Sequence, residues 1–227
     1  MMKVGSLNRS IGSKSKIGCV LGLDFTHLDG ASFMSNGDCF GHLCTNYGSK
    51  WQLDGGYFDG TGVYLQCPHH AVLQPPPLGE LTIEVAVRQE GNVANINPIV
   101  SKSIANNDAY NYIIQDESQK PAIECNHAGT WWVANTPLTL NKLTPIAVSA
   151  KGRGHRIFYK DGNLDKYHAG NNVAAEEFQQ NTEPVRIGKS RWASPNFLLG
   201  VISSVRLYAS TEFAGRILER AIEARRN

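Results

Sequence analysis

Two adjacent tryptophans, Trp131 and Trp132, are the residues with the clearest potential for recognition chemistry. They follow the strand-like stretch 121–129, and neighbouring residues of an extended chain point to opposite faces. One indole should therefore enter the core while the other reaches the surface, where it could stack on a sugar ring. The candidate ligand-binding residues are Trp131, Trp132, Trp192, Tyr110 and Tyr112. The competing interpretation is core packing with one aromatic residue at a protein interface.

Paired carboxylates would be a second kind of chemistry. Glycoside hydrolysis needs two carboxyl groups about 5–5.5 Å apart for retention or about 6.5–9.5 Å apart for inversion. Acids at i and i+2 of a strand share a face at roughly 6.7 Å, but the residues two away from Glu84 are neutral and Glu80 is four away. The neighbouring acids at 116–117 and 176–177 would point to opposite faces. We expect no catalytic residues, although pairing across strands stays open.

Soft metal ligands gather in C-x-x-H-x-C at 39–44 and in Cys67-Pro-His69-His70. This spacing matches no standard zinc finger, and we expect no zinc site. A Cys39–Cys44 or a Cys19–Cys67 disulfide is an open alternative. The first eighteen residues lack the apolar stretch of a secretory signal, and the five cysteines are an odd number, so reduced thiols are favoured.

The formal net charge of +2 is unevenly divided along the chain. Residues 1–18 carry +4, residues 19–212 carry −4 and residues 213–227 carry +2. We expect the basic ends to contact acidic surfaces of other protein subunits in a homo- or hetero-oligomer. The proposed assembly contacts are Lys3, Arg9, Lys14, Lys16, Arg220, Arg225 and Arg226. Basic residues without interleaved aromatics are not typical of nucleic-acid binding.

The elements that must position these residues are strands. Apolar and polar residues alternate in 81–88 and 201–208, and 145–152 and 155–164 indicate two more strands. Asp161-Gly162 predicts a type I′ hairpin, because both central residues of that turn need positive φ. No apolar run approaches the about 20 residues needed to span a bilayer.

Several segments, taken in order from about residue 20 to 220, resemble the laminin-G-like branch of the concanavalin A-like lectin/glucanase superfamily. They are GLDF (22–25), GGYFDGTGVYLQCP (55–68), LTIEVAVRQEG (81–91), PIVSKS (98–103), LNKLTPIAVSAKGRGHRIFYKDGNL (140–164), PVRIGKSRW (184–192) and FLLGVISSVRLYASTEFAGRIL (197–218). The resemblance implies a β-sandwich that serves as a lectin, a hydrolase, an adhesion module or a virion part.

The resemblance also implies calcium in many members, bound by acids near the strand that carries Tyr64. Here Thr61, Gly62 and Val63 supply no carboxylate. Asp24 and Asp59 are the remaining candidate ligands. We expect no cofactor.

The predicted fold is all-β: a two-sheet antiparallel jelly-roll sandwich over 19–212, preceded by a basic extended arm (1–18) and followed by a short helix (213–227). The favoured function is a non-catalytic structural or attachment module of a phage or viral virion, as a capsid-decorating, head or tail component. The alternatives are a lectin-like domain that binds a cell-surface glycan and, second, a divergent glycoside hydrolase. The expected location is the virion, with the cytoplasm as the alternative.

Overall fold

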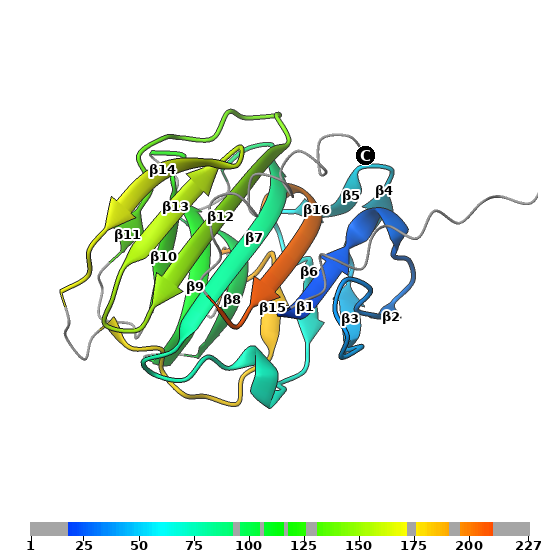
Figure 1. The fold of residues 1–227 in the computed structure, drawn as a ribbon. Helices are drawn as coiled ribbons and strands as arrows, with labels where there is room; N and C mark the ends of the chain where they lie inside the picture. Colours follow the sequence, from blue (N-terminus) through cyan, green and yellow to red (C-terminus); the bar gives the residue numbers. More distant parts are fainter. Residues whose placement is uncertain are drawn as a thin grey trace, which may run out of the picture.

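The computed structural model describes residues 18–92, 96–104, 107–115, 118–125, 131–171, 176–190 and 196–210. Within these ranges the chain is nearly all β, and its strands form two antiparallel sheets packed face to face (Figure 1). The predicted sandwich is therefore confirmed. Apart from Gly18, the basic arm lies outside the described residues, as does the predicted C-terminal helix.

The first sheet has the strand order β14-β13-β12-β7-β16-β5-β4, and β1 also pairs with β16. Its strands are β1 (Cys19–Asp24), β4 (Lys50–Gln52), β5 (Gly55–Asp59), β7 (Glu80–Gln89), β12 (Thr144–Lys151), β13 (Arg156–Lys160), β14 (Asn163–His168) and β16 (Leu199–Tyr208). β5 and β1 pair with successive halves of β16, while β7 lies along its other edge.

The second sheet has the order β11-β10-β9-β8-β15-β6-β3-β2. Its strands are β2 (Ser32–Met34), β3 (Leu43–Tyr47), β6 (Tyr64–Cys67), β8 (Ile96–Ile104), β9 (Asn107–Gln115), β10 (Pro121–Glu124), β11 (Trp132–Val133) and β15 (Val185–Ile187). Two short 3-10 turns, η2 (Phe25–His27) and η3 (Ala71–Leu73), interrupt the strands.

The strands predicted from alternating residues are present as β7, β12, β13 and β16. In β7 the side chains of Leu81, Ile83, Val85 and Val87 are all buried in the core between the sheets. Each such apolar side chain contributes about 1.5–3 kcal/mol when it leaves water. The turn between β13 and β14 is the predicted hairpin, with φ of 55° at Asp161 and 81° at Gly162.

A disulfide joins Cys44 of β3 to Cys67 of β6, with Cα atoms 4.4 Å apart. The expectation of reduced thiols is wrong for these two residues, and both suggested pairings are wrong as well. Sequence spacing could not find this pair, because the pairing of β3 with β6 brings together two residues 23 apart in the chain. The remaining thiols belong to Cys19, Cys39 and Cys125.

Candidate functional site

A row of polar side chains crosses the outer face of the second sheet. Strand register aligns one residue from each of six neighbouring strands: Thr45, Gln66, Arg186, Ser101, Asn111 and Glu124. In the adjacent row, Leu65, Ile187 and Tyr112 belong to the core. Successive residues of a strand face opposite ways, so these six residues, which we call the outer row, face away from the core.

The outer row changes from accessible to buried along its length. Thr45, Gln66 and Arg186 are half-buried, whereas Ser101 and Asn111 are 0% exposed. The accessible end, on β3, β6 and β15, is the part that a ligand can reach.

Two stacked tyrosines lie beside this accessible end. Tyr47 follows Thr45 by two residues and Tyr64 precedes Gln66 by two, so both share the outer face. Their ring centroids are 4.5 Å apart with planes 11° from parallel, and Tyr47 is 44% exposed. The ammonium of Lys189 lies 4.4 Å from the Tyr64 centroid in a cation–π contact. We call Tyr47, Tyr64 and Lys189 the tyrosine platform.

Gly188 makes this position of Lys189 possible. Its φ is 80°, and a Cβ there would lie 2.4 Å from Cδ1 of Phe58. Any other residue would be strained and would collide with a core ring. This explains the glycine of the R-I-G segment.

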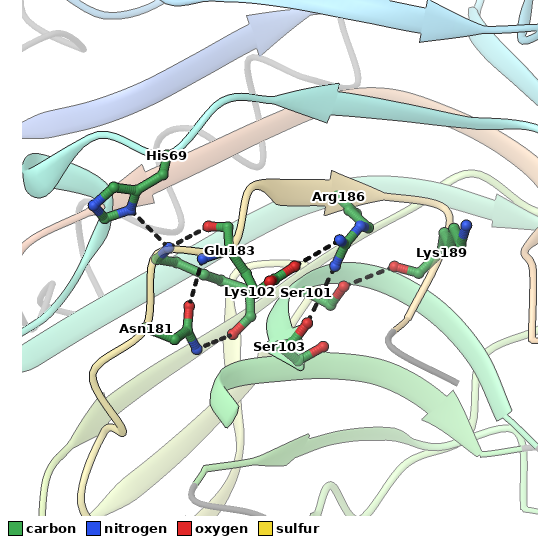
Figure 2. A network of polar contacts seen from close by, with 8 residues as sticks. All are labelled: His69, Ser101, Lys102, Ser103, Asn181, Glu183, Arg186 and Lys189. Atoms are coloured by element: carbon green, nitrogen blue, oxygen red, sulfur yellow. Dashed lines mark hydrogen bonds and ion pairs between the residues drawn. The ribbon is translucent and has the colours of Figure 1, made fainter. Parts of the chain in front are cut away.

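Hydrogen bonds fix Arg186 at the accessible end of the outer row (Figure 2). One guanidinium nitrogen donates to Oε2 of Glu183 at 2.8 Å and another donates to the carbonyl of Ser103 at 3.1 Å. A guanidinium has five N–H donors in a rigid fork, so Arg186 keeps donors beyond these contacts. An exposed aromatic ring beside a hydroxyl, an amide and a held guanidinium combines the groups that bind a sugar.

A pocket of about 420 Å³ opens at the strand ends of the same sheet, where β6 ends and β15 begins. It is lined by His69, Ala71, Gln74, Gln180, Asn181 and Thr182. The amides of its walls are held in place, because Gln74 donates to the carbonyl of Gln179 at 3.0 Å and Gln180 to that of Pro75 at 2.8 Å. The disulfide at Cys67 anchors the segment that carries His69.

Lys102 adjoins this pocket and is 0% exposed. Its ammonium donates to Nδ1 of His69 at 3.0 Å and to the backbone carbonyl of Glu183 (Figure 2). Burial lowers the pKa of Lys102 to about 8; the charge of Glu183 opposes this effect and that of Arg186 adds to it. Burial, then the charges of Lys102 and His70, lower the pKa of His69.

The two tryptophans have different surroundings. Trp132 is opposite Ile123, a core residue, and packs against the core, as predicted for one of the indoles. Its ring centroid is 5.2 Å from that of His168 and 5.9 Å from Cζ of Arg156. Trp131 is half-buried, and its part in ligand binding stays a prediction.

The other aromatic candidates do not join a surface site. Tyr110 and Tyr112 are 0% exposed and belong to the core. Their assignment as ligand-binding residues is wrong, because they share the inward face of β9 with Ile114. Trp192 lies outside the described residues.

All seven basic residues predicted to make assembly contacts also lie outside the described residues. They are Lys3, Arg9, Lys14, Lys16, Arg220, Arg225 and Arg226. Their role stays a prediction.

The candidate metal ligands have other partners. Asp24 accepts hydrogen bonds from the backbone N–H and hydroxyl of Thr26, and Asp59 accepts one from the N–H of Thr61. Nε2 of His42 contacts the carbonyl of Val20 at 2.8 Å. Among the described residues, no group of three or more His, Cys, Asp or Glu side chains is placed to hold a metal ion.

Glu84 has no carboxylate directly across either neighbouring strand. Its partners in the register are Ala147 on β12 and Arg206 on β16. This arrangement differs from the carboxylate pair of a glycosidase.

The tyrosine platform and Lys102 are the residues that sequence reasoning missed. Tyr47 alternates with Thr45, and Tyr64 with Gln66, which indicates a shared strand face in each case. Only the pairing of β3 with β6 shows that the two faces join.

The family assignment follows from a sequence comparison. A family described as the concanavalin A-like lectin/glucanases superfamily matches residues 59–214. The chain belongs to this superfamily. Comparison with curated proteins finds no match.

Several solved structures match nearly the whole chain in fold, at low sequence identity. Trypanosoma rangeli sialidase is 15% identical with a TM-score of 0.70, over 92% of this chain and 33% of its own. The binding domain of Paraclostridial Mosquitocidal Protein 1 is 10% identical with a TM-score of 0.69, over 90% of this chain and 52% of its own. Botulinum neurotoxin type C, whose cell entry depends on interaction with two ganglioside molecules, is 12% identical with a TM-score of 0.70, over 93% of this chain and 53% of its own.

This chain therefore spans about a third of the sialidase and about half of each toxin chain. At these identities the likeness shows the fold alone. In the described part of the chain, no helix has the length and apolar character needed to cross a membrane.

Proposed function

We propose that this protein is a non-catalytic, glycan-binding β-sandwich that uses the tyrosine platform and the accessible end of the outer row. The observation that carries the proposal is the stacked Tyr47–Tyr64 pair, with Tyr47 44% exposed, next to Thr45, Gln66 and Arg186. The flat ring offers an apolar surface to a sugar, while the hydroxyl, amide and guanidinium offer hydrogen bonds to its hydroxyl groups.

Two further observations support this proposal over the virion role favoured from sequence. The ganglioside-dependent neurotoxin has the same fold. The charged ends through which the virion hypothesis expects assembly contacts lie outside the described residues. The Cys44–Cys67 disulfide fits an oxidising compartment, where a protein meets cell-surface glycans.

A glycan array probed with the wild type, Tyr47→Ala and Tyr167→Ala tests the proposal. Tyr167 is the matched control, because it is 58% exposed but belongs to β14 of the first sheet. Tyr47→Ala should weaken binding to the recognised glycan by about tenfold, and Tyr167→Ala should leave it unchanged. An array on which the wild type binds no glycan contradicts the proposal.

Trp131→Ala belongs in the same experiment as the second candidate. Loss of binding in Trp131→Ala, with Tyr47→Ala unaffected, would move the site to the β10–β11 end of the second sheet and overturn the role of the tyrosine platform.

A further inference from the structure

We propose that the pocket lined by His69, Gln74 and Asn181 binds a ligand that carries a carboxylate, with the acid group held by His69 and, once the imidazole turns away from its contact with Lys102, by the Lys102 ammonium as well. The pocket is built from other residues than the tyrosine platform, so this inference does not depend on the function proposed above.

The first argument is the missing counter-charge of Lys102. Its ammonium is buried and contacts an imidazole nitrogen and a backbone carbonyl. The carboxylate of the nearby Glu183 is bonded to Arg186. Within the described residues, Lys102 has no ion pair of its own. A buried charge without an opposite charge is costly, and a bound carboxylate would supply that charge.

The second argument is the positive surroundings of the site. The charged and titratable groups of the elements around Lys102 are His69 and His70 after β6, Glu183 and Arg186 at β15, and two residues of β9, Tyr110 opposite Lys102 and Asp108 opposite Ser103. The charge of Glu183 offsets part of the Lys102 charge, that of Arg186 adds to it, and Asp108 is not among the groups that shift the pKa of Lys102, so positive charge remains beside the pocket. This charge favours an anion over a neutral or cationic ligand.

The third argument is access. His69 is exposed, lines the pocket and also contacts the ammonium of Lys102. Rotation of its imidazole would bring Lys102 to the pocket wall. The hydroxyl of Thr182 and the amide-rich walls suit a ligand with hydroxyl groups beside its carboxylate, which is the chemistry of an acidic sugar.

The site should take up protons when it binds. An anion next to Lys102 and His69 raises the pKa of both groups, because it stabilises their charged forms. In the free protein the pKa of His69 lies below its usual value and that of Lys102 is about 8. At pH 7, carboxylate binding should therefore protonate part of the His69 population, and affinity should fall as pH rises above about 8.

Isothermal titration calorimetry at pH 7 with glucuronate, glucose and acetate tests the proposal. Glucuronate should bind, and the apparent enthalpy should differ between two buffers of different ionisation enthalpy, in the sense of proton uptake. Glucose, which lacks the carboxylate, should bind at least about tenfold more weakly. Acetate binding as tightly as glucuronate would support the anion site and assign it to a free carboxylate rather than an acidic sugar.

Lys102→Met should weaken glucuronate binding by at least about tenfold, whereas Lys142→Met, which removes an exposed lysine, should not change it. Should Lys102→Met not fold, His69→Gln provides the second test, because it should reduce the proton uptake to the smaller share of Lys102. Equal binding of glucuronate by the wild type and Lys102→Met, or equal binding of glucuronate and glucose, overturns the proposal. Tyr47→Ala should leave glucuronate binding intact, so failure here is distinguishable from failure of the tyrosine platform.

Discussion

Two buried cations, Arg156 and Lys102, have opposite surroundings. Both are 0% exposed. Arg156, at the start of β13, donates four hydrogen bonds to the carbonyls of Lys151, Gly154, His155 and Glu176. Its guanidinium also lies 5.9 Å from the ring centroids of Trp132 and of Phe178.

Lys102 has much weaker compensation than Arg156. It has three N–H donors and makes two hydrogen bonds, one to an imidazole nitrogen and one to a carbonyl. A lysine charge concentrated on one atom is also more strongly hydrated than a guanidinium, so its transfer out of water costs more. Arg156 therefore connects two loops through its hydrogen bonds, whereas Lys102 is the cation for which we propose an anionic ligand.

Arg156→Met should have the largest effect on stability. It removes four hydrogen bonds to carbonyls in two loops, so the free energy of unfolding should fall by about 3–5 kcal/mol. Urea denaturation measures this change. Arg156→Lys should show an intermediate loss, because one ammonium cannot reproduce the fork. If Arg156→Met lowers the free energy of unfolding by less than about 1 kcal/mol, the four hydrogen bonds to the carbonyls do not stabilise the fold.

Lys102→Met should change stability in the opposite direction. Because burial holds the pKa of Lys102 at about 8 instead of 10.5, the unfolded chain binds this proton more tightly than the folded chain does. The wild type therefore carries a penalty that is full below pH 8 and disappears as pH rises towards 10.5. Lys102→Met should gain about 2–3 kcal/mol at pH 7.

Denaturation at pH 7 and at pH 10 checks this sign. The gain at pH 7 should shrink at pH 10, and Lys142→Met should show no gain at either pH. A destabilised Lys102→Met at pH 7 would mean that Lys102 has a structural role like that of Arg156.

Sequence reasoning predicted the frame of this fold but not the orientation of Lys102. Alternating residues predicted β7 and β16, because both strands have one apolar face. In β8 the register shifts between Pro98 and Val100 and again between Lys102 and Ser103. Between these shifts the two-residue period holds, and Lys102 shares the inward face with Val100 and with Tyr110, its partner on β9. The residue type hides this placement, because a lysine is almost never fully buried and sequence reasoning assigns it to the surface.

The candidate site was harder to predict for a related reason. A ligand surface assembled across strands depends on which strands pair, and Tyr47 meets Tyr64 only through the pairing of β3 with β6. Tyr110 and Tyr112 could have been assigned to the core, because they alternate in step with Ile114. Their polar hydroxyl groups made a surface role plausible from sequence.

Glu183→Gln should have the smallest effect on stability, and it tests whether the pKa of Lys102 responds to the charges of its own neighbours. The Glu183–Arg186 pair is partly exposed, so its loss should lower the free energy of unfolding by less than about 1 kcal/mol. The charge of Glu183 raises the pKa of Lys102, so the pKa of Lys102 should be lower in Glu183→Gln. The cost of burying the Lys102 charge should then begin to disappear at a pH below 8. Unfolding measured against pH, with and without Lys102→Met, reports this shift.

Glu177→Gln is the matched control for Glu183→Gln. Glu177 also forms an ion pair, with Arg153 at 2.5 Å, and its side chain is similarly exposed, at 22% against 25% for Glu183. It differs in location, because it follows Glu176, whose carbonyl accepts a hydrogen bond from Arg156. Its substitution should leave the titration of Lys102 in place, because that group responds to Glu183 and Arg186. An equal shift in both variants would mean that Lys102 senses the overall charge of the protein rather than its own pocket, and the contrast between the two cations would then rest on their hydrogen bonds alone.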